Sequence, residues 1–217
     1  MFSRHELLYL TADGWARALA APGADSALLG PWRENDWPLV VRRREPGSGA
    51  DTVSLGLPAP PAADGARRRF ACTVPVAAVA RRQAPLALAA IVASAPAHWQ
   101  GALAAVLADG GHDGAPPLQV FGSCAMQALT GQSYVGPASD IDLLLELTTL
   151  AQLDAGLALM GRHSAALPLD GELVFPAGDA VSWKEWASGA DQRVLVKSVD
   201  AVRLLPKAQL RARLQAP

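Results

Sequence analysis

The sequence has few of the features that mark several common classes of protein. Two cysteines in 217 residues cannot build a disulfide framework or a cysteine-based zinc site. The four histidines stand far apart in the sequence, without the spacing of metal ligands. The formal net charge is −1, which argues against a nucleic-acid partner. A hydrophobic content of 51% with only 18% charged residues excludes a disordered chain.

Long apolar runs are also missing. The most apolar stretch, residues 85–97, contains two prolines, and it is shorter than the ~20 residues that a membrane-spanning helix needs. The first 21 residues mix charged side chains into apolar ones, so we expect no signal peptide. The sequence therefore predicts a cytoplasmic protein with no membrane partner.

Hydrophobic patterning predicts two domains, residues 1–93 and 94–217. In the first, helical spacing over 5–21 precedes extended runs at 39–41, 53–57 and 67–76, which indicate a small β-rich domain. The second alternates helices and strands. The expected helices are 95–110, 124–130 and 150–164, and the expected strands are 118–121, 140–147, 173–175 and 194–196. The predicted fold class is α+β, with a mixed sheet flanked by helices in the second domain.

Two aspartates stand in an apolar run that reads as a strand. Asp140 and Asp142 are separated by one residue, so on a strand both carboxylates project from the same face. Two neighbouring carboxylates repel each other unless a cation lies between them. Oxygen ligands of this kind suit Mg²⁺ or Mn²⁺, held by one or two carboxylates and by substrate phosphates. Asp140 and Asp142 are thus candidate metal ligands and catalytic residues.

A glycine and a serine supply a candidate phosphate site. Gly122 and Ser123 lie between an expected strand and an expected helix. Glycine lets the backbone approach a phosphate closely, and the N–H groups at a helix start bind anions. Either motif alone is commonly a solvated strand edge or turn. Their order, with Gly-Ser before Asp-x-Asp and apolar residues around both, favours a catalytic site.

Further acids and cations are less firmly assigned. Asp170 and Glu172 are two residues apart, so on a strand their side chains project from the same face, and either could supply a third carboxylate. Asp170 is preferred because its shorter side chain would position a metal or a base more tightly. Lys197 lies in an apolar run, where it either stands on a solvated strand face or binds phosphate. Arg67 and Arg69 belong to one of two arginine triplets and could bind substrate phosphates or an acidic partner, or form a solvated basic face.

At these residues the sequence resembles the polymerase-β-like nucleotidyltransferase superfamily. The block FGSCAMQALTGQSYVGPASDIDLLLEL is similar to that of the phosphoribosyl-dephospho-CoA transferases, the holo-acyl-carrier-protein synthases of malonate decarboxylase. The likeness extends over RHELLYL and WPLVVRRR near the start and DGELVFPAGDAVSWKEW near the end. This resemblance implies a polymerase-β-like second domain, with Asp140 and Asp142 as the catalytic aspartates.

The resemblance also implies a reaction. Members transfer the phosphoribosyl-dephospho-CoA group from 2'-(5''-triphosphoribosyl)-3'-dephospho-CoA to a serine of the apo acyl carrier protein of malonate decarboxylase, and diphosphate leaves. Two alternatives stay open at this point. One is a nucleotidyltransferase with a small-molecule acceptor, and the other is a non-catalytic module that binds a carrier protein.

Overall fold

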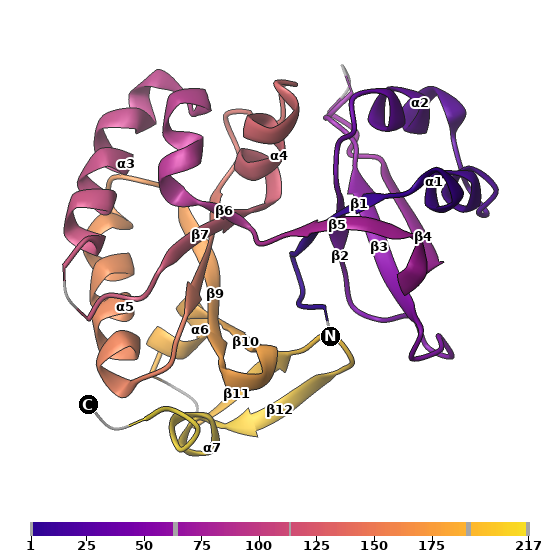
Figure 1. The fold of residues 1–217 in the computed structure, drawn as a ribbon. Helices are drawn as coiled ribbons and strands as arrows, with labels where there is room; N and C mark the ends of the chain where they lie inside the picture. Colours follow the sequence, from indigo (N-terminus) through magenta and orange to yellow (C-terminus); the bar gives the residue numbers. More distant parts are fainter. Residues whose placement is uncertain (1, 63–64, 113, 190–191, 216–217) are drawn as a thin grey trace. The chain divides into compact units, whose positions relative to one another are not determined.

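The chain forms two compact units in a computed structural model that describes residues 2–62, 65–112, 114–189 and 192–215 (Figure 1). The first unit comprises Met1–Pro85 with Val199–Ala201, and the second comprises Leu86–Ser198 with Val202–Pro217. Helices and two sheets, one antiparallel and one mixed, confirm the α+β class. The boundary between the two units lies after residue 85, whereas the sequence predicted it after residue 93.

The first unit is built on a five-stranded antiparallel sheet in the order β4-β3-β2-β1-β5. Its strands are β1 (Leu7–Leu10), β2 (Leu39–Val41), β3 (Thr52–Pro58), β4 (Arg69–Pro75) and β5 (Val79–Gln83). Helices α1 (Ala12–Leu19) and α2 (Ser26–Glu34) and the 3₁₀ turn η1 (Val76–Ala78) complete it. The unit is β-rich, as its alternating residues predicted.

The helix expected over residues 5–21 is wrong in its first half. Leu7–Leu10 is strand β1, which pairs with β2 and β5, and all four of its residues are buried. A strand covered on both faces shows a continuous apolar run rather than alternation, and such a run is easily read as helical. The helix begins only after Thr11, whose hydroxyl accepts a hydrogen bond from the N–H of Gly14 at 3.1 Å.

The second unit is built on a seven-stranded sheet in the order β12-β11-β10-β9-β8-β7-β6. Its strands are β6 (Leu86–Ala87), β7 (Leu118–Phe121), β8 (Ile141–Glu146), β9 (Leu169–Phe175), β10 (Asp179–Ser182), β11 (Arg193–Lys197) and β12 (Val202–Pro206). The other elements are η2 (Leu88–Ser94), α3 (Ala97–Gly110), α4 (Gly122–Thr130), α5 (Leu150–His163), η3 (Pro176–Gly178), α6 (Trp183–Ala187) and α7 (Lys207–Arg211). Only the β8–β9 pair is parallel among the described pairs, because α5 crosses over between these strands.

Residues 86–93 belong to the second unit because their side chains pack there. Leu86 pairs with Val120 of β7, and Leu88 and Ile91 of η2 are fully buried in the core of this unit. The sequence of a short apolar run with turns at both ends does not indicate whether it packs in the core of the first unit or of the second. The core itself lies between one face of the sheet and helices that include α3 and α5, which run side by side (Figure 1).

Over the described ranges, every helix is too short or too polar to reach across a bilayer.

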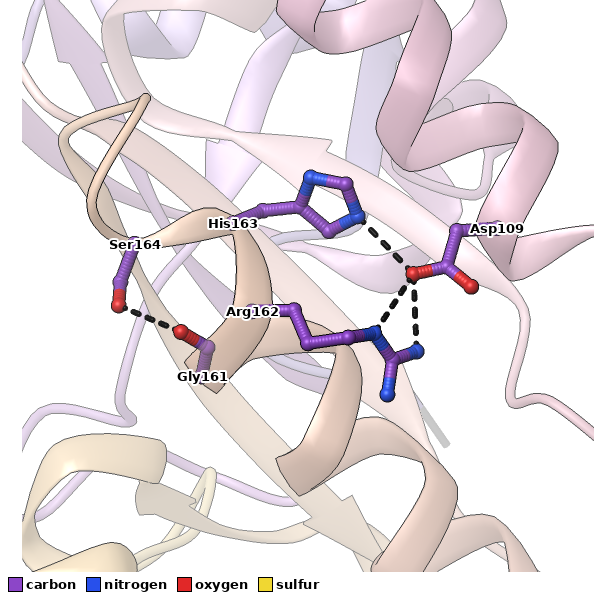
Figure 2. Close-up of polar contacts among 5 residues, drawn as sticks. All are labelled: Asp109, Gly161, Arg162, His163 and Ser164. Carbon is purple, nitrogen blue, oxygen red and sulfur yellow. Dashed lines mark hydrogen bonds and ion pairs between the residues drawn. The ribbon is translucent and has the colours of Figure 1, made fainter.

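A charged cluster joins the last turns of α3 and α5 (Figure 2). The Arg162 guanidinium donates to Asp109 Oδ2 at 2.9 Å, and His163 Nε2 lies 3.0 Å from the same oxygen. A negative charge at the C-terminal end of a helix opposes the helix dipole, so Asp109 depends on its contacts with Arg162 and His163. The hydrogen bonds from Arg162 first, and then from His163, hold the pKa of Asp109 below its usual value.

This cluster gives stability a dependence on acid pH. A carboxyl group with a depressed folded pKa stabilises the fold above its unfolded pKa of about 3.9, and this contribution disappears as the pH falls through the folded value. We expect Asp109→Asn to lower the midpoint of urea unfolding at pH 7, with a difference from wild type that shrinks below pH 4. A difference that stays constant from pH 7 to pH 3.5 would show that the Asp109 charge contributes nothing.

Candidate active site

Three carboxylates meet at one end of the second sheet. Asp140 directly precedes β8, Asp142 is the second residue of β8, and Asp170 is the second residue of β9. One carboxylate oxygen from each residue lies within 4.8 Å of the others. Asp140 is exposed, whereas Asp142 and Asp170 are half-buried. An all-oxygen set at this separation fits a hard divalent cation such as Mg²⁺ or Mn²⁺.

The parallel pairing of β8 and β9 decides which acid joins this group. Asp142 stands directly opposite Asp170, whereas Glu172 stands opposite Leu144, one step further along both strands. Glu172 is buried, and its carboxylate forms an ion pair with Lys197 Nζ at 3.4 Å. The preferred third acid is therefore beside the Asp-x-Asp pair. Glu172, predicted as a metal ligand, lies outside the group of three.

The Gly-Ser turn lies against the carboxylates, as register and backbone geometry require. Phe121, the last residue of β7, pairs with Asp142, so Gly122 begins α4 next to that side chain. Gly122 has φ = +69°, and a Cβ built there would lie 2.1 Å from Asp142 Oδ2. Both facts require glycine at this position. Ser123 follows in the first turn of α4 and is half-buried.

A second glycine allows β9 to approach β8. A Cβ on Gly171 would lie 2.3 Å from the carbonyl oxygen of Leu143, and its φ is +156°. Without this close approach, Asp170 would stand further from Asp142. The Gly171 N–H also donates to Asp170 Oδ1 at 2.8 Å, which fixes the carboxylate.

Two side chains near the site were not identified from the sequence. Lys184 of α6 places its Nζ 3.6 Å from Asp170 Oδ1. Gln127 of α4 holds the loop that leads to Asp140, because its Oε1 accepts hydrogen bonds from the N–H groups of Tyr134 and Val135 at 3.1 and 3.0 Å. Neither residue carries a local motif. Lys184 had a weak signal in the pattern WKEW, where it is one of two charged residues between two buried tryptophans.

Cys124 lies beside the Gly-Ser turn but has the character of a packing residue. Its side chain is buried, and its Sγ lies 3.8 Å from the carbonyl oxygen of Asp140. Burial first, and then the nearby charges of Asp142 and Asp140, raise the pKa of the Cys124 thiol to about 12. The sulfur is therefore protonated at neutral pH and is a poor nucleophile.

The remaining predicted substrate contacts fall in different places. Lys197 is on β11 of the second unit, with its side chain 40% exposed and paired to Glu172. Arg67 and Arg69 belong to the first unit, and both are exposed. Their neighbour Arg68 forms an ion pair with Asp25 at 3.0 Å. The roles of Lys197, Arg67 and Arg69 in substrate binding stay predictions.

Carboxylates on adjacent strands, next to a glycine turn that opens a helix, are typical of enzymes that act on phosphate esters. Comparison with known proteins gives the particular family. The C-terminal domain of phosphoribosyl-dephospho-CoA transferase MdcG matches residues 86–208, and the N-terminal domain of the same family matches residues 3–85.

Curated relatives give the same result. A phosphoribosyl-dephospho-CoA transferase of Xanthomonas campestris pv. campestris is 43% identical over 212 residues, which cover 97% of each chain. One of Bradyrhizobium diazoefficiens is 37% identical and covers 95% of this chain and 91% of the relative. No solved structure matches the chain. The chain therefore belongs to the phosphoribosyl-dephospho-CoA transferase family, and it is an enzyme of the transferase class.

Proposed function

We propose that this protein transfers phosphoribosyl-dephospho-CoA from its triphosphate-activated form to a serine of the apo acyl carrier protein of malonate decarboxylase. Membership of the family supports the transferred group. The observation that carries the chemistry is the group of three carboxylates against the Gly-Ser turn. The cytoplasmic location stays a prediction.

The carboxylates are the proposed holders of a divalent cation. Asp140 and Asp142 would bind Mg²⁺ (or Mn²⁺), and Asp170 completes the group as a third ligand or as the acceptor of the serine proton. A bound cation would neutralise charge on the transferred phosphate and on the departing diphosphate. The donor set supports this fit, because one carboxylate oxygen from each of the three residues lies within 4.8 Å of the others, and oxygen ligands suit a hard divalent cation.

The start of α4 is the proposed cradle for the polyphosphate. The first N–H groups of a helix lack partners within the helix, and the N-cap residue of α4, Phe121, has no side chain that accepts a hydrogen bond from them. With no Cβ on Gly122, a phosphate oxygen can approach these N–H groups beside Asp142. The Ser123 hydroxyl adds a donor in the same turn. Lys184, next to Asp170, supplies positive charge at the opposite side of the carboxylates.

The proposed reaction is a substitution at the phosphorus atom nearest the ribose. The serine oxygen of the carrier protein forms a new bond to this phosphorus, and the bond to the outer two phosphates breaks. Diphosphate leaves with the electron pair of the broken bond. The proton of the serine hydroxyl passes to a carboxylate of the site or to water, and the product is a phosphodiester.

Diphosphate release with different acceptors tests this proposal. The donor and Mg²⁺ are incubated with the protein, together with apo carrier protein, with a small hydroxyl compound, or with no acceptor. We expect rapid release only with the carrier protein. A variant carrier in which the acceptor serine is alanine serves as the control. Equal release with the small hydroxyl compound would replace the proposal with a small-molecule nucleotidyltransferase.

A further inference from the structure

An exposed apolar patch lies on the edge of the second sheet. Among the described residues, four large apolar side chains are notably exposed, and three of them are here: Leu195 of β11, at 41%, and Val202 and Leu204 of β12, at 42% and 51%. Leu195 pairs directly with Leu204, so their side chains adjoin. We call Arg193, Leu195, Val202 and Leu204 the β11–β12 patch. Exposed clusters of this kind commonly mark interaction sites.

The patch is on the same face of the sheet as the catalytic carboxylates. Residues paired across neighbouring strands share a face, and so do residues two apart on one strand. Four successive pairs therefore connect the carboxylates to the patch: Asp142 with Asp170, Glu172 with Ser182, Ala180 with Lys197, and Leu195 with Leu204. The alternate residues of these strands, such as Leu143, Val181 and Val196, lie in the core under the helices. At ~4.8 Å per strand and ~3.3 Å per residue along a strand, Leu195 is about 12 Å from Asp170, and Leu204 and Val202 are about 16 and 19 Å away.

The chain around the patch is basic, whereas the rest of the second unit is acidic. Residues 184–213 contain seven Lys and Arg against three Asp and Glu, and residues 86–183 contain one basic against nine acidic side chains. Some of these cations are held internally, since Arg203 and Arg213 both bind the buried carboxylate of Asp179. Arg193 is exposed at the margin of the patch, where its guanidinium donates to the carbonyl of Leu204. Arg211 is exposed on α7.

We infer that the β11–β12 patch docks the protein acceptor, a small acidic protein that offers apolar side chains beside its acidic ones. This inference rests on the proposed function, which requires a protein substrate. A partner seated there would contact Leu195 and Leu204 in its centre and Arg193 at its rim. The face shared with Asp142 and Asp170 lets a serine of that partner reach the carboxylates over a distance spanned by one helix of a small protein.

Steady-state kinetics with apo carrier protein test the docking surface. Leu204→Glu places a negative charge in the patch, and we expect the KM for the carrier to rise about tenfold, with the KM for the donor unchanged. Arg193→Glu should raise the same KM, with an effect that weakens as salt increases. Val76→Glu is the matched control, because Val76 is 40% exposed in the first unit. It should leave both KM values unchanged.

The outcomes separate the surface from the function. If the wild-type protein transfers the group to the carrier and both patch variants keep the wild-type KM, the docking site is elsewhere and this inference is overturned. A rise in KM only for a variant of Arg67 and Arg69 would likewise overturn it. If Leu204→Glu instead converts a dimer to a monomer in sedimentation, with no change in KM, the patch binds a second copy. Circular dichroism checks that each variant is folded. If Leu204→Glu does not fold, the KM of Arg193→Glu for the carrier protein decides whether the β11–β12 patch is the docking site.

Discussion

Asp142→Asn should reduce the rate of transfer about a thousandfold, with little effect on the KM for the carrier protein. A loss of this size corresponds to about 4 kcal/mol of transition-state stabilisation, which is in the range that a metal site contributes. Asparagine keeps the shape of the side chain but removes the charge that would hold the cation opposite Asp170. Single-turnover rates for the two proteins measure the effect directly.

Stability provides a second reading of the same variant. Without metal, three carboxylates within 4.8 Å repel one another, so Asp142→Asn should melt at the same temperature as wild type or slightly above it. With Mg²⁺ and donor, the wild-type protein should gain stability and the variant should not. Asp154→Asn, on the exposed face of α5, is the matched control. Equal gains for all three proteins would show that Asp142 does not hold the cation.

Gly122→Ala should lower the transfer rate by a factor of about 100, because a misplacement of about 1 Å at a reacting centre has that effect. The added Cβ would lie 2.1 Å from Asp142 Oδ2, so the carboxylate must move. The positive φ of Gly122 adds backbone strain, which should also reduce stability by about 1 kcal/mol. Transfer kinetics and urea unfolding measure the two effects separately.

Gly101→Ala is the control for that substitution. Gly101 lies within α3, and a Cβ there would meet nothing within 4 Å. Alanine is favoured over glycine in a helix interior by about 1 kcal/mol, so this variant should be slightly more stable and fully active. Full activity of Gly122→Ala would contradict the close packing of this glycine against Asp142.

The Asp-x-Asp pair and the Gly-Ser turn could be found from the sequence because their chemistry is local. Strand alternation fixes the common face of Asp140 and Asp142, and the glycine marks the turn before a helix. The third acid depends on a different property. Asp170 and Glu172 have equal parity, and only the register of β8 against β9, allowed by the close approach at Gly171, brings Asp170 opposite Asp142.

The errors in the fold have a similar origin. Strand β1 is buried on both sides, so its sequence lacks the alternation of apolar and small residues that identified β3. Residues 86–93 are apolar without a period, and the choice of core depends on the pairing of Leu86 with Val120. Lys184 was missed because its approach to Asp170 depends on where α6 begins. Each of these three features depends on contacts between residues far apart in the sequence, and a short window of sequence carries no information about such contacts.

Intact-mass spectrometry of the acyl carrier protein tests the central claim most directly. Apo carrier protein is incubated with the triphosphoribosyl donor and this enzyme, in Mg²⁺ or in excess EDTA. We expect the carrier to gain the mass of one phosphoribosyl-dephospho-CoA group on a serine in Mg²⁺, and to stay unmodified in EDTA or with Asp142→Asn. A carrier that remains unmodified by the folded wild-type enzyme in Mg²⁺, or is modified equally by Asp142→Asn, would contradict the central claim.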